Sequence, residues 1–390
     1  MKFFRLFKQK NKEFLVLDLS PSSVKGLVFE KKEGKNLIKK FARESIERFG
    51  VFDGKDFEFE IIKNAVDKVL GNLGIKNRPS QFYGIVGISP SILKIKILKA
   101  DFKRDRESER ISKREQKEIY QDVLKKVESK LFKEIERKKG MIASDFHVFK
   151  KLILEEKISG YEVSSIFGLR GKDLTFKVLI IFCQNKYFDL IKKLKETLPL
   201  RRFNIFHEAE GLIKVYKPDE NPNRIFVDIG EISTLIFFFG KTLEHVEEIP
   251  MGGYDFSREL SKILNLTETE AESLKERISK DQLSAGVKEK IEKFLSPMLD
   301  VWLSCLKKKI RGSRRDFYPF SQKIFIFGGG SLLPGIKKSI EKISSKDSYG
   351  GQSTKVDFLL PDNLALINKT KSHFSVRETP IILLTFCDYE

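Results

Sequence analysis

RIFVDIGEISTLIFFFGKTLEHVEEIPMGGYDF, residues 224–256, is the part of the sequence that decides the fold. It begins with an apolar strand that ends on Asp228, and a second apolar run follows over residues 234–239. A Gly240-Lys241 turn then leads into a third strand and into Gly252-Gly253. Some phosphate-binding folds use this order of strand, acidic turn, hairpin and double glycine to bring backbone N–H groups up to a nucleotide. The stretch therefore predicts a phosphate-binding hairpin.

The same arrangement occurs near the start of the chain, in FLVLDLSPSSVKGLVFEKKEGKNLIKKF, residues 14–41. Asp18 corresponds to Asp228, residues 22–29 form the second strand, and Gly34-Lys35 is the turn. A repeat separated by about half the chain implies two similar halves that face each other across a cleft.

Composition sets the class of protein and the compartment. A chain of 390 residues, 41% of them hydrophobic, is long enough for two or more folded domains. No apolar run approaches the ~20 residues that cross a bilayer, and the first ten residues are too interrupted for a signal peptide. The three cysteines, Cys183, Cys305 and Cys387, are scattered and are typical of reduced core residues. We therefore expect a cytoplasmic protein.

The formal charge of +19 has three interpretations: a nucleic-acid partner, an anionic membrane partner, or a lysine-rich composition without a specific partner. Lysines occur in almost every segment with glutamates between them, which favours the third interpretation. No DNA-binding motif is present, so we expect no nucleic-acid partner. The four histidines are isolated, and no GxSxG or Walker A motif or metal-ligand pair suggests other chemistry.

The first twelve residues, MKFFRLFKQKNK, combine aromatic and basic side chains. On a helix Phe3 and Phe7 would share one face with Phe4 beside them, and Lys2 and Arg5 would lie opposite. This is the pattern of a short membrane-surface anchor, in which each basic residue near an anionic leaflet contributes about 1 kcal/mol. The alternative is a terminus that only solubilises the chain or packs on its own domain.

About ninety residues after the first hairpin interrupt the α/β pattern. Their periodicity predicts a strand (92–102), a long charged helix (112–139) and two further strands (146–158 and 174–182). Apolar residues recur on one face of the helix, so the opposite charged face is expected to be solvated. Such a strand-helix-strand-strand unit indicates a small inserted subdomain. The chain is expected to close with a strand over residues 381–386.

Five segments resemble the actin-like ATPase superfamily, which includes Hsp70, actin, FtsA and PilM, and they occur in the order of that family. The resemblance covers nearly the whole chain and implies an α/β, duplicated actin-like fold with two lobes around a nucleotide cleft and an inserted SHS2-like subdomain. The segments are VLDLSPSSVK (16–25), FHEAEGL (206–212), VDIGEIST (227–234), AESLKERIS (271–279) and IFGGGSLLPGI (326–336).

The resemblance implies a division of the chain into lobes. It gives a basic aromatic segment (1–12), a first lobe (13–91, 184–222 and 362–390), the inserted subdomain (92–183) and a second lobe (223–361).

The resemblance also implies a site for ATP and Mg²⁺. Asp18 and Asp228 would hold Mg²⁺ through waters, and Glu208 with Asp228 would serve catalysis. Glu272 and Lys275 would reach the nucleoside. The remaining nucleotide-binding candidates are Asp18, Ser20, Ser22, Ser23, Lys25, Gly230, Ser233, Thr234, Gly252, Gly253, Gly328, Gly329, Gly330 and Ser331.

Both phosphate loops depart from the family pattern. Ser20 and Pro21 stand where the first loop usually has Gly and Thr or Ser, and proline has no N–H to donate. Glu231 and Ile232 stand where the second loop commonly has small residues, and a carboxylate there would repel a triphosphate. We therefore expect weakened ATP binding and at most slow hydrolysis. The alternative is that the two loop aspartates only cap their own turns.

Within the superfamily, the insert is similar to that of FtsA and PilM. The turn GLRGKDL (168–174) resembles FtsA, whereas the basic opening followed by LDLSPSSVK resembles PilM. FtsA usually ends in an amphipathic membrane helix, which is not expected after residue 390, so the N-terminal segment would replace it.

The expected function is a membrane-peripheral scaffold, FtsA-like in cell division. The implied partner is then the tail of the tubulin-like division protein, together with further copies of the chain in a dimer or filament. A PilM-like alternative implies a peptide of a pilus inner-membrane protein. An alternative of another class is an active ATPase or kinase of the same fold.

Overall fold

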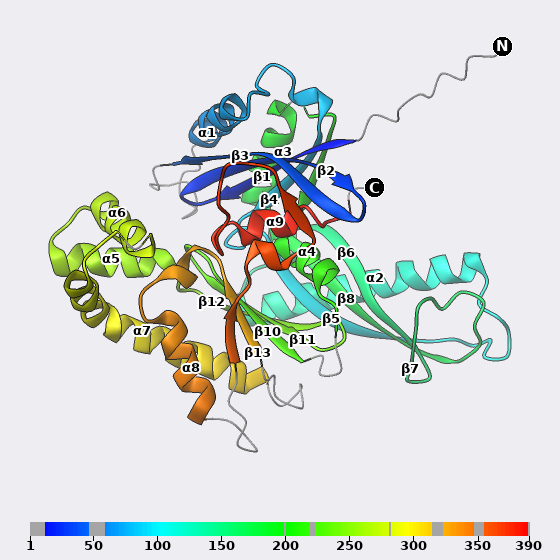
Figure 1. The fold of residues 1–390 in the computed structure, drawn as a ribbon. Helices are drawn as coiled ribbons and strands as arrows, with labels where there is room; N and C mark the ends of the chain where they lie inside the picture. The colour runs from blue at the N-terminus through cyan, green and yellow to red at the C-terminus, as the bar shows by residue number, and fades with distance from the viewer. Residues whose placement is uncertain are drawn as a thin grey trace, which may run out of the picture. The chain divides into compact units, whose positions relative to one another are not determined.

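The computed structural model describes residues 12–46, 59–198, 200–218, 223–280, 282–313, 323–346 and 355–388. The chain divides into two compact units. The first comprises the described parts of residues 1–89, 192–215 and 359–390, and the second those of residues 90–191 and 216–358. Each unit is built on its own sheets (Figure 1).

The first unit contains a six-stranded sheet in the order β15-β3-β2-β1-β4-β9. Its centre is the predicted first hairpin, in which β1 pairs antiparallel with β2 and parallel with β4. Both faces of β1 are buried, so its sequence is an almost continuous apolar run. The strands are β1 (Glu13–Ser20), β2 (Ser23–Lys32), β3 (Lys35–Ser45), β4 (Tyr83–Ile88), β9 (Arg202–Phe206) and β15 (Leu366–Asn368).

Helices cover both faces of this sheet (Figure 1). Gly26 in β2 lets α1 approach closely, because a Cβ there would lie 2.3 Å from Val69 Cγ1. On the other face, Gly87 in β4 makes room for Leu384. The helices are α1 (Phe59–Asn72), α3 (Asn185–Thr197), which begins in the second unit and ends in the first, α4 (Glu208–Val215) and α9 (Thr379–Leu384).

The predicted strand over residues 381–386 is wrong, because residues 381–384 belong to the helix α9 and a turn follows. Pro380 stands in the first turn, where its missing N–H costs nothing. The apolar side chains that follow are buried on all sides, so their short run carries no period that separates a buried strand from a buried helix. The helix packs against α4, where a Cβ on Gly211 would lie 1.9 Å from Leu383 O.

The second unit contains a five-stranded sheet in the order β12-β11-β10-β13-β14. It repeats the pattern of the first sheet, because β10 pairs antiparallel with β11 and parallel with β13. The predicted repeat of two similar hairpins is thus confirmed. The strands are β10 (Arg224–Ile229), β11 (Thr234–Phe239), β12 (Leu243–Ile249), β13 (Lys323–Phe327) and β14 (Lys355–Phe358).

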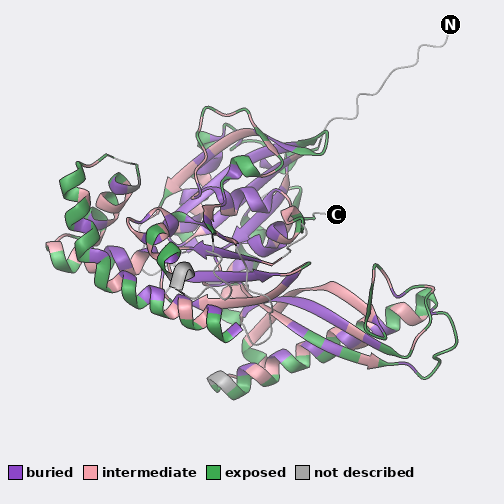
Figure 2. Cartoon of the chain, turned by 60° about the horizontal axis from the view of Figure 1, so that its bottom comes forward, coloured by how far each residue is buried: buried purple, intermediate pink, exposed green. Residues whose placement is uncertain are grey.

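Four helices belong to this sheet, and its core shows as buried strands and helix faces in Figure 2. Trp302 is the only tryptophan in the chain and is fully buried, with its Nε1 donating to Thr234 Oγ1 at 3.0 Å. Thr267 caps α6 in a capping box with Glu270. The helices are α5 (Gly253–Leu264), α6 (Glu268–Ser279), α7 (Ala285–Ser313) and α8 (Ile336–Lys346).

The predicted insert forms a four-stranded sheet in the order β5-β8-β6-β7, with α2 packed on it. The predicted apolar residues of the helix are buried, namely Ile119, Val123, Val127, Leu131 and Ile135. The short strand β7 was not predicted. The elements are β5 (Lys94–Lys103), α2 (Lys113–Lys139), β6 (Phe146–Ile158), β7 (Tyr161–Val163) and β8 (Asp173–Gln184).

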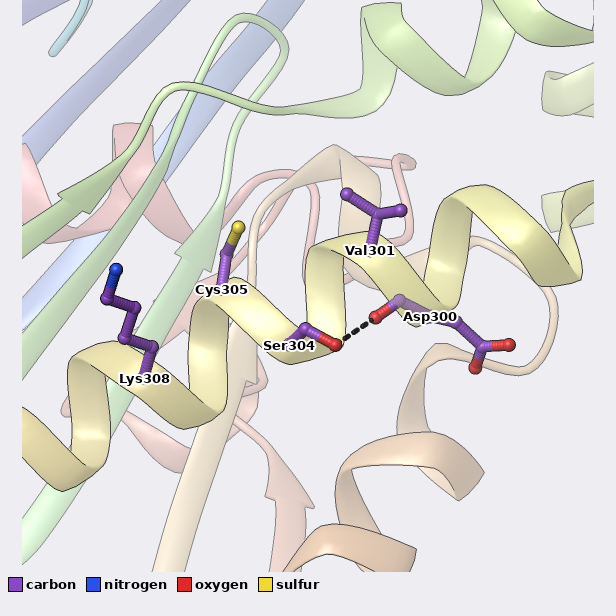
Figure 3. Close-up of a pocket in the computed structure, with 5 residues that line it drawn as sticks. All are labelled: Asp300, Val301, Ser304, Cys305 and Lys308. Carbon is purple, nitrogen blue, oxygen red and sulfur yellow. Dashed lines mark hydrogen bonds between the residues drawn. The ribbon is translucent and has the colours of Figure 1, made fainter.

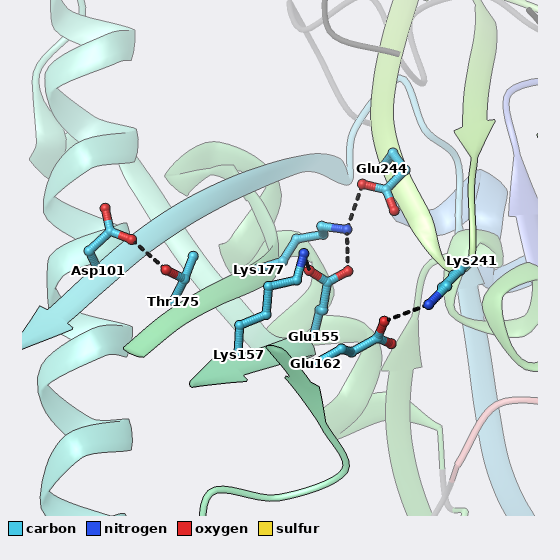
Figure 4. Close-up of polar contacts among 8 residues, drawn as sticks. All are labelled: Asp101, Glu155, Lys157, Glu162, Thr175, Lys177, Lys241 and Glu244. Carbon is cyan, nitrogen blue, oxygen red and sulfur yellow. Dashed lines mark hydrogen bonds and ion pairs between the residues drawn. The ribbon is translucent and has the colours of Figure 1, made fainter. Parts of the chain in front are cut away.

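Charged side chains join the insert to the edge strand β12 of the five-stranded sheet (Figure 4). Lys177 on β8 donates to Glu155 on β6 at 2.8 Å and to Glu244 on β12 at 2.5 Å. Lys94 on β5 donates to Glu248 on β12 at 2.6 Å. These contacts run between residues far apart in the sequence, and they make the insert part of the second unit.

Among the described residues, no helix is both long and apolar enough to span a bilayer. Short 3₁₀ turns complete the elements at Pro79–Gln81, Ala143–Asp145, Gly329–Leu332 and Pro361–Asn363.

Candidate nucleotide site

Asp228 lies at the end of β10, and the glycine-rich loop after β13 is folded directly against it. In the parallel β10–β13 pair Asp228 is opposite Phe327, so Gly328 follows next to the carboxylate. A Cβ on Gly328 would lie 2.1 Å from Asp228 Oδ1, and this residue has a φ of +83°. Only glycine fits both conditions. A Cβ on Gly330 would similarly lie 2.5 Å from Ile229 Cγ2, so the turn after Asp228 and the glycine-rich segment 326–336 are brought together.

The double glycine, Gly252-Gly253, also contacts the turn that follows Asp228. The N–H of Gly253 donates to Gly230 O at 2.9 Å, and the N–H of Tyr254 donates to Glu231 O at 2.8 Å. A Cβ on Gly252 would lie 2.4 Å from Glu231 O, which explains the need for glycine here. The amino end of α5 is therefore fastened to the loop by the same N–H groups that could otherwise face an anion.

The first turn of α5 is capped as well. The N–H of Gly252 donates to Asp255 Oδ2 at 3.0 Å, and the N–H of Asp255 donates to Gly252 O at 3.1 Å. Together with the bonds of Gly253 and Tyr254, every N–H from Gly252 to Asp255 has a protein acceptor. An anion at this end of the helix would have to replace one of these bonds.

Glu272 and Lys275 lie on α6 and are tied to α5. Lys275 Nζ donates to Gly253 O at 2.9 Å and to Ser257 Oγ at 2.8 Å, and it lies 2.6 Å from Glu272 Oε2. Ser257 Oγ donates in turn to Glu272 Oε2 at 2.7 Å. Ser257 was missed in the sequence because a helical serine carries no motif signal. Its position four residues after Gly253, on the face toward α6, is what makes it part of this cluster.

Three predicted hydroxyls and one exposed glycine occupy different places around the turn. Thr234 is fully buried and its Oγ1 donates to Met251 O at 2.8 Å, so this hydroxyl is hydrogen-bonded inside the core. Ser233 is buried, and its carbonyl accepts from the N–H of Gly230 at 3.0 Å. Ser331 Oγ donates to Gly328 O at 2.7 Å, whereas Gly329 is exposed.

In the first unit, Asp18 is paired with Lys25. The two residues are opposite each other in the β1–β2 register, and Lys25 Nζ lies 2.9 Å from Asp18 Oδ2. Lys25 Nζ also lies 3.4 Å from Arg377 O. Both side chains are nearly buried, so the pair neutralises the acidic group at the first loop.

The turn between β1 and β2 is closed by its own serines. Ser20 Oγ donates to Ser23 O at 2.8 Å and lies 3.0 Å from Ser23 Oγ. Pro21 is buried in the turn, and Ser22 is half-buried, with its carbonyl accepting from the N–H of Ile46 at 2.8 Å. The side chain of Ser20 is therefore directed back to the hairpin.

Glu208 lies in the first turn of α4 and is buried. The preceding His207 caps the helix, because its Nδ1 accepts from the N–H of Ala209 at 3.0 Å. Glu210 Oε1 accepts from the N–H of His207 at 3.1 Å. Two acidic groups thus stand at the amino end of α4, where the helix dipole favours negative charge.

Within the described residues, no group of three or more His, Cys, Asp or Glu side chains could hold a metal ion directly. Figure 3 shows a separate hollow on α7, where Ser304 Oγ donates to Asp300 O at 2.8 Å. Its lining comes from one helix and contains none of the predicted site residues. The predicted membrane residues Lys2, Phe3, Phe4, Arg5 and Phe7 lie outside the described part of the chain.

Comparisons with known proteins agree with this architecture. A family model described as cell division protein FtsA matches residues 225–370, which is less than half of the chain. Among solved structures, the chain is similar to a PilM–PilN type IV pilus biogenesis complex, with 16% identity, coverage of 95% of this chain and 97% of that chain, and a TM-score of 0.69. A weaker likeness is to the ethanolamine utilization protein EutJ from Carboxydothermus hydrogenoformans, with 12% identity, coverage of 96% and 90%, and a TM-score of 0.49. No curated protein matches the sequence.

The two hairpins with their parallel neighbours, and the structural match over nearly the whole chain, define an actin-like ATPase fold. The fold predicted from the sequence is confirmed. Within this class, residues 225–370 match the FtsA family model, and nearly the whole chain shares its fold with the PilM structure. At these identities the likeness establishes the fold, and the nucleotide chemistry and the partner have to be argued from the chain's own residues. The part of each predicted residue in nucleotide binding stays a prediction.

Proposed function

We propose that this chain is a cytoplasmic, membrane-peripheral scaffold of the FtsA/PilM type, which binds ATP and Mg²⁺ weakly and recruits a protein partner. An FtsA-like role in cell division is the first candidate, and a PilM-like role in type IV pilus assembly is the alternative. The proposal rests on the actin-like fold, the FtsA family model over residues 225–370 and the departures of the two loops from a phosphate-binding pattern.

Hydrogen bonds within the second loop are the observation that favours a scaffold over an active ATPase. The N–H groups of Gly253 and Tyr254 donate to Gly230 O and Glu231 O, at 2.9 and 2.8 Å. A phosphate needs such N–H groups as donors, and a donor already bonded in the protein gains little by exchanging one acceptor for another. Binding of ATP through this loop is therefore expected to be weak.

The same site has features that fit a nucleotide. Gly328 and Gly330 allow the backbone to approach closely, and Asp228 offers a buried carboxylate beside them. Asp228, with Asp18 in the first unit, would hold Mg²⁺ through waters, and Glu208 would orient water. When bound, Mg²⁺ would neutralise charge on the phosphates. In the first unit Lys25 already neutralises Asp18, which lowers the gain from a cation there.

We further propose that the chain is organised as a first lobe (13–91, 184–222 and 362–390), an SHS2-like interaction subdomain (92–183) and a second lobe (223–361). The insert carries exposed apolar side chains, with Tyr161 78% and Phe167 48% exposed. Exposed apolar side chains that form one contiguous patch mark interaction surfaces. They support partner binding or self-association into a dimer or filament.

The partner proposal is tested with two synthetic peptides in fluorescence anisotropy against the full chain. One carries the C-terminal tail of the tubulin-like division protein from the same genome, and the other the cytoplasmic segment of the pilus inner-membrane protein. If the chain is a division scaffold, it is expected to bind the first peptide and not a scrambled version of it. If it is a pilus scaffold, it is expected to bind the second peptide. Absence of binding to both peptides would remove the partner proposal.

The second candidate function is an active ATPase. It is favoured by one observation. The carboxylate of Asp228 lies directly beside Gly328, a position that only glycine can occupy. A kinase is less well supported, because the sequence carries no motif for a catalytic carboxylate beside a substrate pocket.

A further inference from the structure

Three cations gather around one aromatic ring on the first unit. Arg201 and Arg202 place their guanidinium carbons 4.9 and 5.8 Å from the centroid of the Tyr83 ring, and Lys12 Nζ lies 5.7 Å from it. All three cationic residues are exposed. We name this cluster of Lys12, Tyr83, Arg201 and Arg202 the basic edge, because β9 is the last strand on this side of the six-stranded sheet.

The ring at the centre of the basic edge is held in place. Tyr83 lies opposite Arg202 in the parallel β4–β9 pair, and Phe14 packs against its ring with centroids 5.6 Å apart. The N–H of Arg201 donates to Phe82 O at 3.1 Å, which fixes the backbone just before β9. The cations therefore lie in or directly before strands of the sheet, and no long loop is needed to bring them together.

The basic edge has no carboxylate of its own within the described residues. Neither Lys12 nor either arginine forms an ion pair with a described acidic group. The nearest acid in sequence, Glu13, is bound to Lys39, which also holds Glu30, at 2.8 and 2.7 Å. Like charges so placed repel one another, and cation–π contact with one ring offsets only part of that. An external anion would remove the repulsion.

We propose that the basic edge is a docking surface for the phosphate headgroups of an anionic membrane. Guanidinium and ammonium groups are the usual ligands of phosphate, and the half-exposed tyrosine ring suits the interface between headgroups and water. In the sequence, Lys12 follows residues 2–7, which are expected to contact the membrane. The inference rests on the membrane-peripheral part of the proposed function.

The test is co-sedimentation of the full chain with vesicles of phosphatidylcholine, with and without phosphatidylglycerol. The double substitution Arg201→Ala/Arg202→Ala removes about 1 kcal/mol per arginine near an anionic surface, so the partition coefficient is expected to fall about 30-fold. The matched control is Arg110→Ala/Lys172→Ala, which removes the same charge from exposed positions of the insert. It is expected to lower binding by less than about 3-fold, because these two charges do not belong to the basic edge and contribute only to the general attraction.

Two further measurements separate the sources of the effect. Arg201→Lys/Arg202→Lys keeps the charge and is expected to retain most of the binding, which excludes loss of folding as the cause in the alanine variant. Millimolar inorganic phosphate is expected to leave vesicle binding nearly unchanged at constant ionic strength. Release by phosphate would show a site for the free ion and would overturn the membrane assignment.

Equal loss in the alanine variant and its control would also overturn the inference, as would binding to neutral vesicles alone. If the wild-type chain binds no vesicle, the inference and the membrane-peripheral proposal both fail. The partner proposal is measured by peptide anisotropy without membranes, so its outcome stays separate.

Discussion

Lys177 is the most buried of the described lysines that join the insert to the five-stranded sheet. Its side chain is only 4% exposed, and it lies between Glu155 of the insert and Glu244 of β12 (Figure 4). Burial by itself would raise the pKa of Glu155, but hydrogen bonds from Lys157 and Lys177 outweigh it and hold the pKa below its usual value. We expect Lys177→Met to destabilise the second unit strongly.

The magnitude follows from the burial of the charges that remain. At 2.8 Å and an effective dielectric constant of about 20, one such ion pair is worth roughly 6 kcal/mol before desolvation is counted. Desolvation of the lysine cancels part of this, and removal of one partner of a buried pair costs about 3–5 kcal/mol in practice. Lys157 touches the same Glu155 but is 37% exposed, so Lys157→Met is expected to cost less than about 1 kcal/mol.

Urea unfolding measured by Trp302 fluorescence is the assay. The indole is fully buried in the core of the second unit and is the only one in the chain, so its signal reports this unit. The triple variant Lys177→Met/Glu155→Gln/Glu244→Gln should recover most of the loss, because no charge is then left buried. A free energy of unfolding that is the same for Lys177→Met and Lys157→Met would refute the reasoning.

Two other predictions concern packing and pH. Gly211→Ala would place a methyl group 1.9 Å from Leu383 O, so thermal unfolding is expected to show a loss of about 1–3 kcal/mol or more. Gly71→Ala, whose Cβ meets nothing within 4 Å on an exposed part of α1, should instead stabilise by up to about 1 kcal/mol, and a loss as large as at Gly211 would contradict this. The hydrogen bond with His245 outweighs burial and lowers the pKa of Glu247 from 4.5 to about 2. Its contribution is therefore complete above pH 4.5 and is lost as the pH falls toward 2, so Glu247→Gln should flatten the pH dependence of unfolding in that window, and an unchanged slope would count against it.

The repeated hairpins could be predicted from the sequence because strand, acidic residue and turn recur in the same order in both halves. The inserted subdomain could also be predicted, since its helix keeps one apolar face over its whole length. By contrast, α9 was predicted as a strand, because Ile381–Leu384 is buried on every side and shows no period.

The residues of the candidate site could be predicted from the sequence, whereas the hydrogen bonds between them could not. The glycines near Asp228 were predicted from the double glycine at 252–253 and from the resemblance of segment 326–336 to the family, and the structure shows that each permits a close approach. The bonds that decide the chemistry join carbonyls and N–H groups, such as Tyr254 to Glu231, and backbone groups leave no mark in the sequence. The same holds for the basic edge, since Arg201 and Tyr83 meet only through the pairing of β4 with β9.

The central claim, a scaffold that binds nucleotide weakly and does not turn it over efficiently, is tested by titrating the full chain with labelled ATP and Mg²⁺ while phosphate release is measured. We expect weak binding and almost no release, because the N–H groups of Gly253 and Tyr254 are already bonded in the protein. Tight binding with measurable turnover that Asp18→Ala abolishes would contradict the claim and would show an active ATPase.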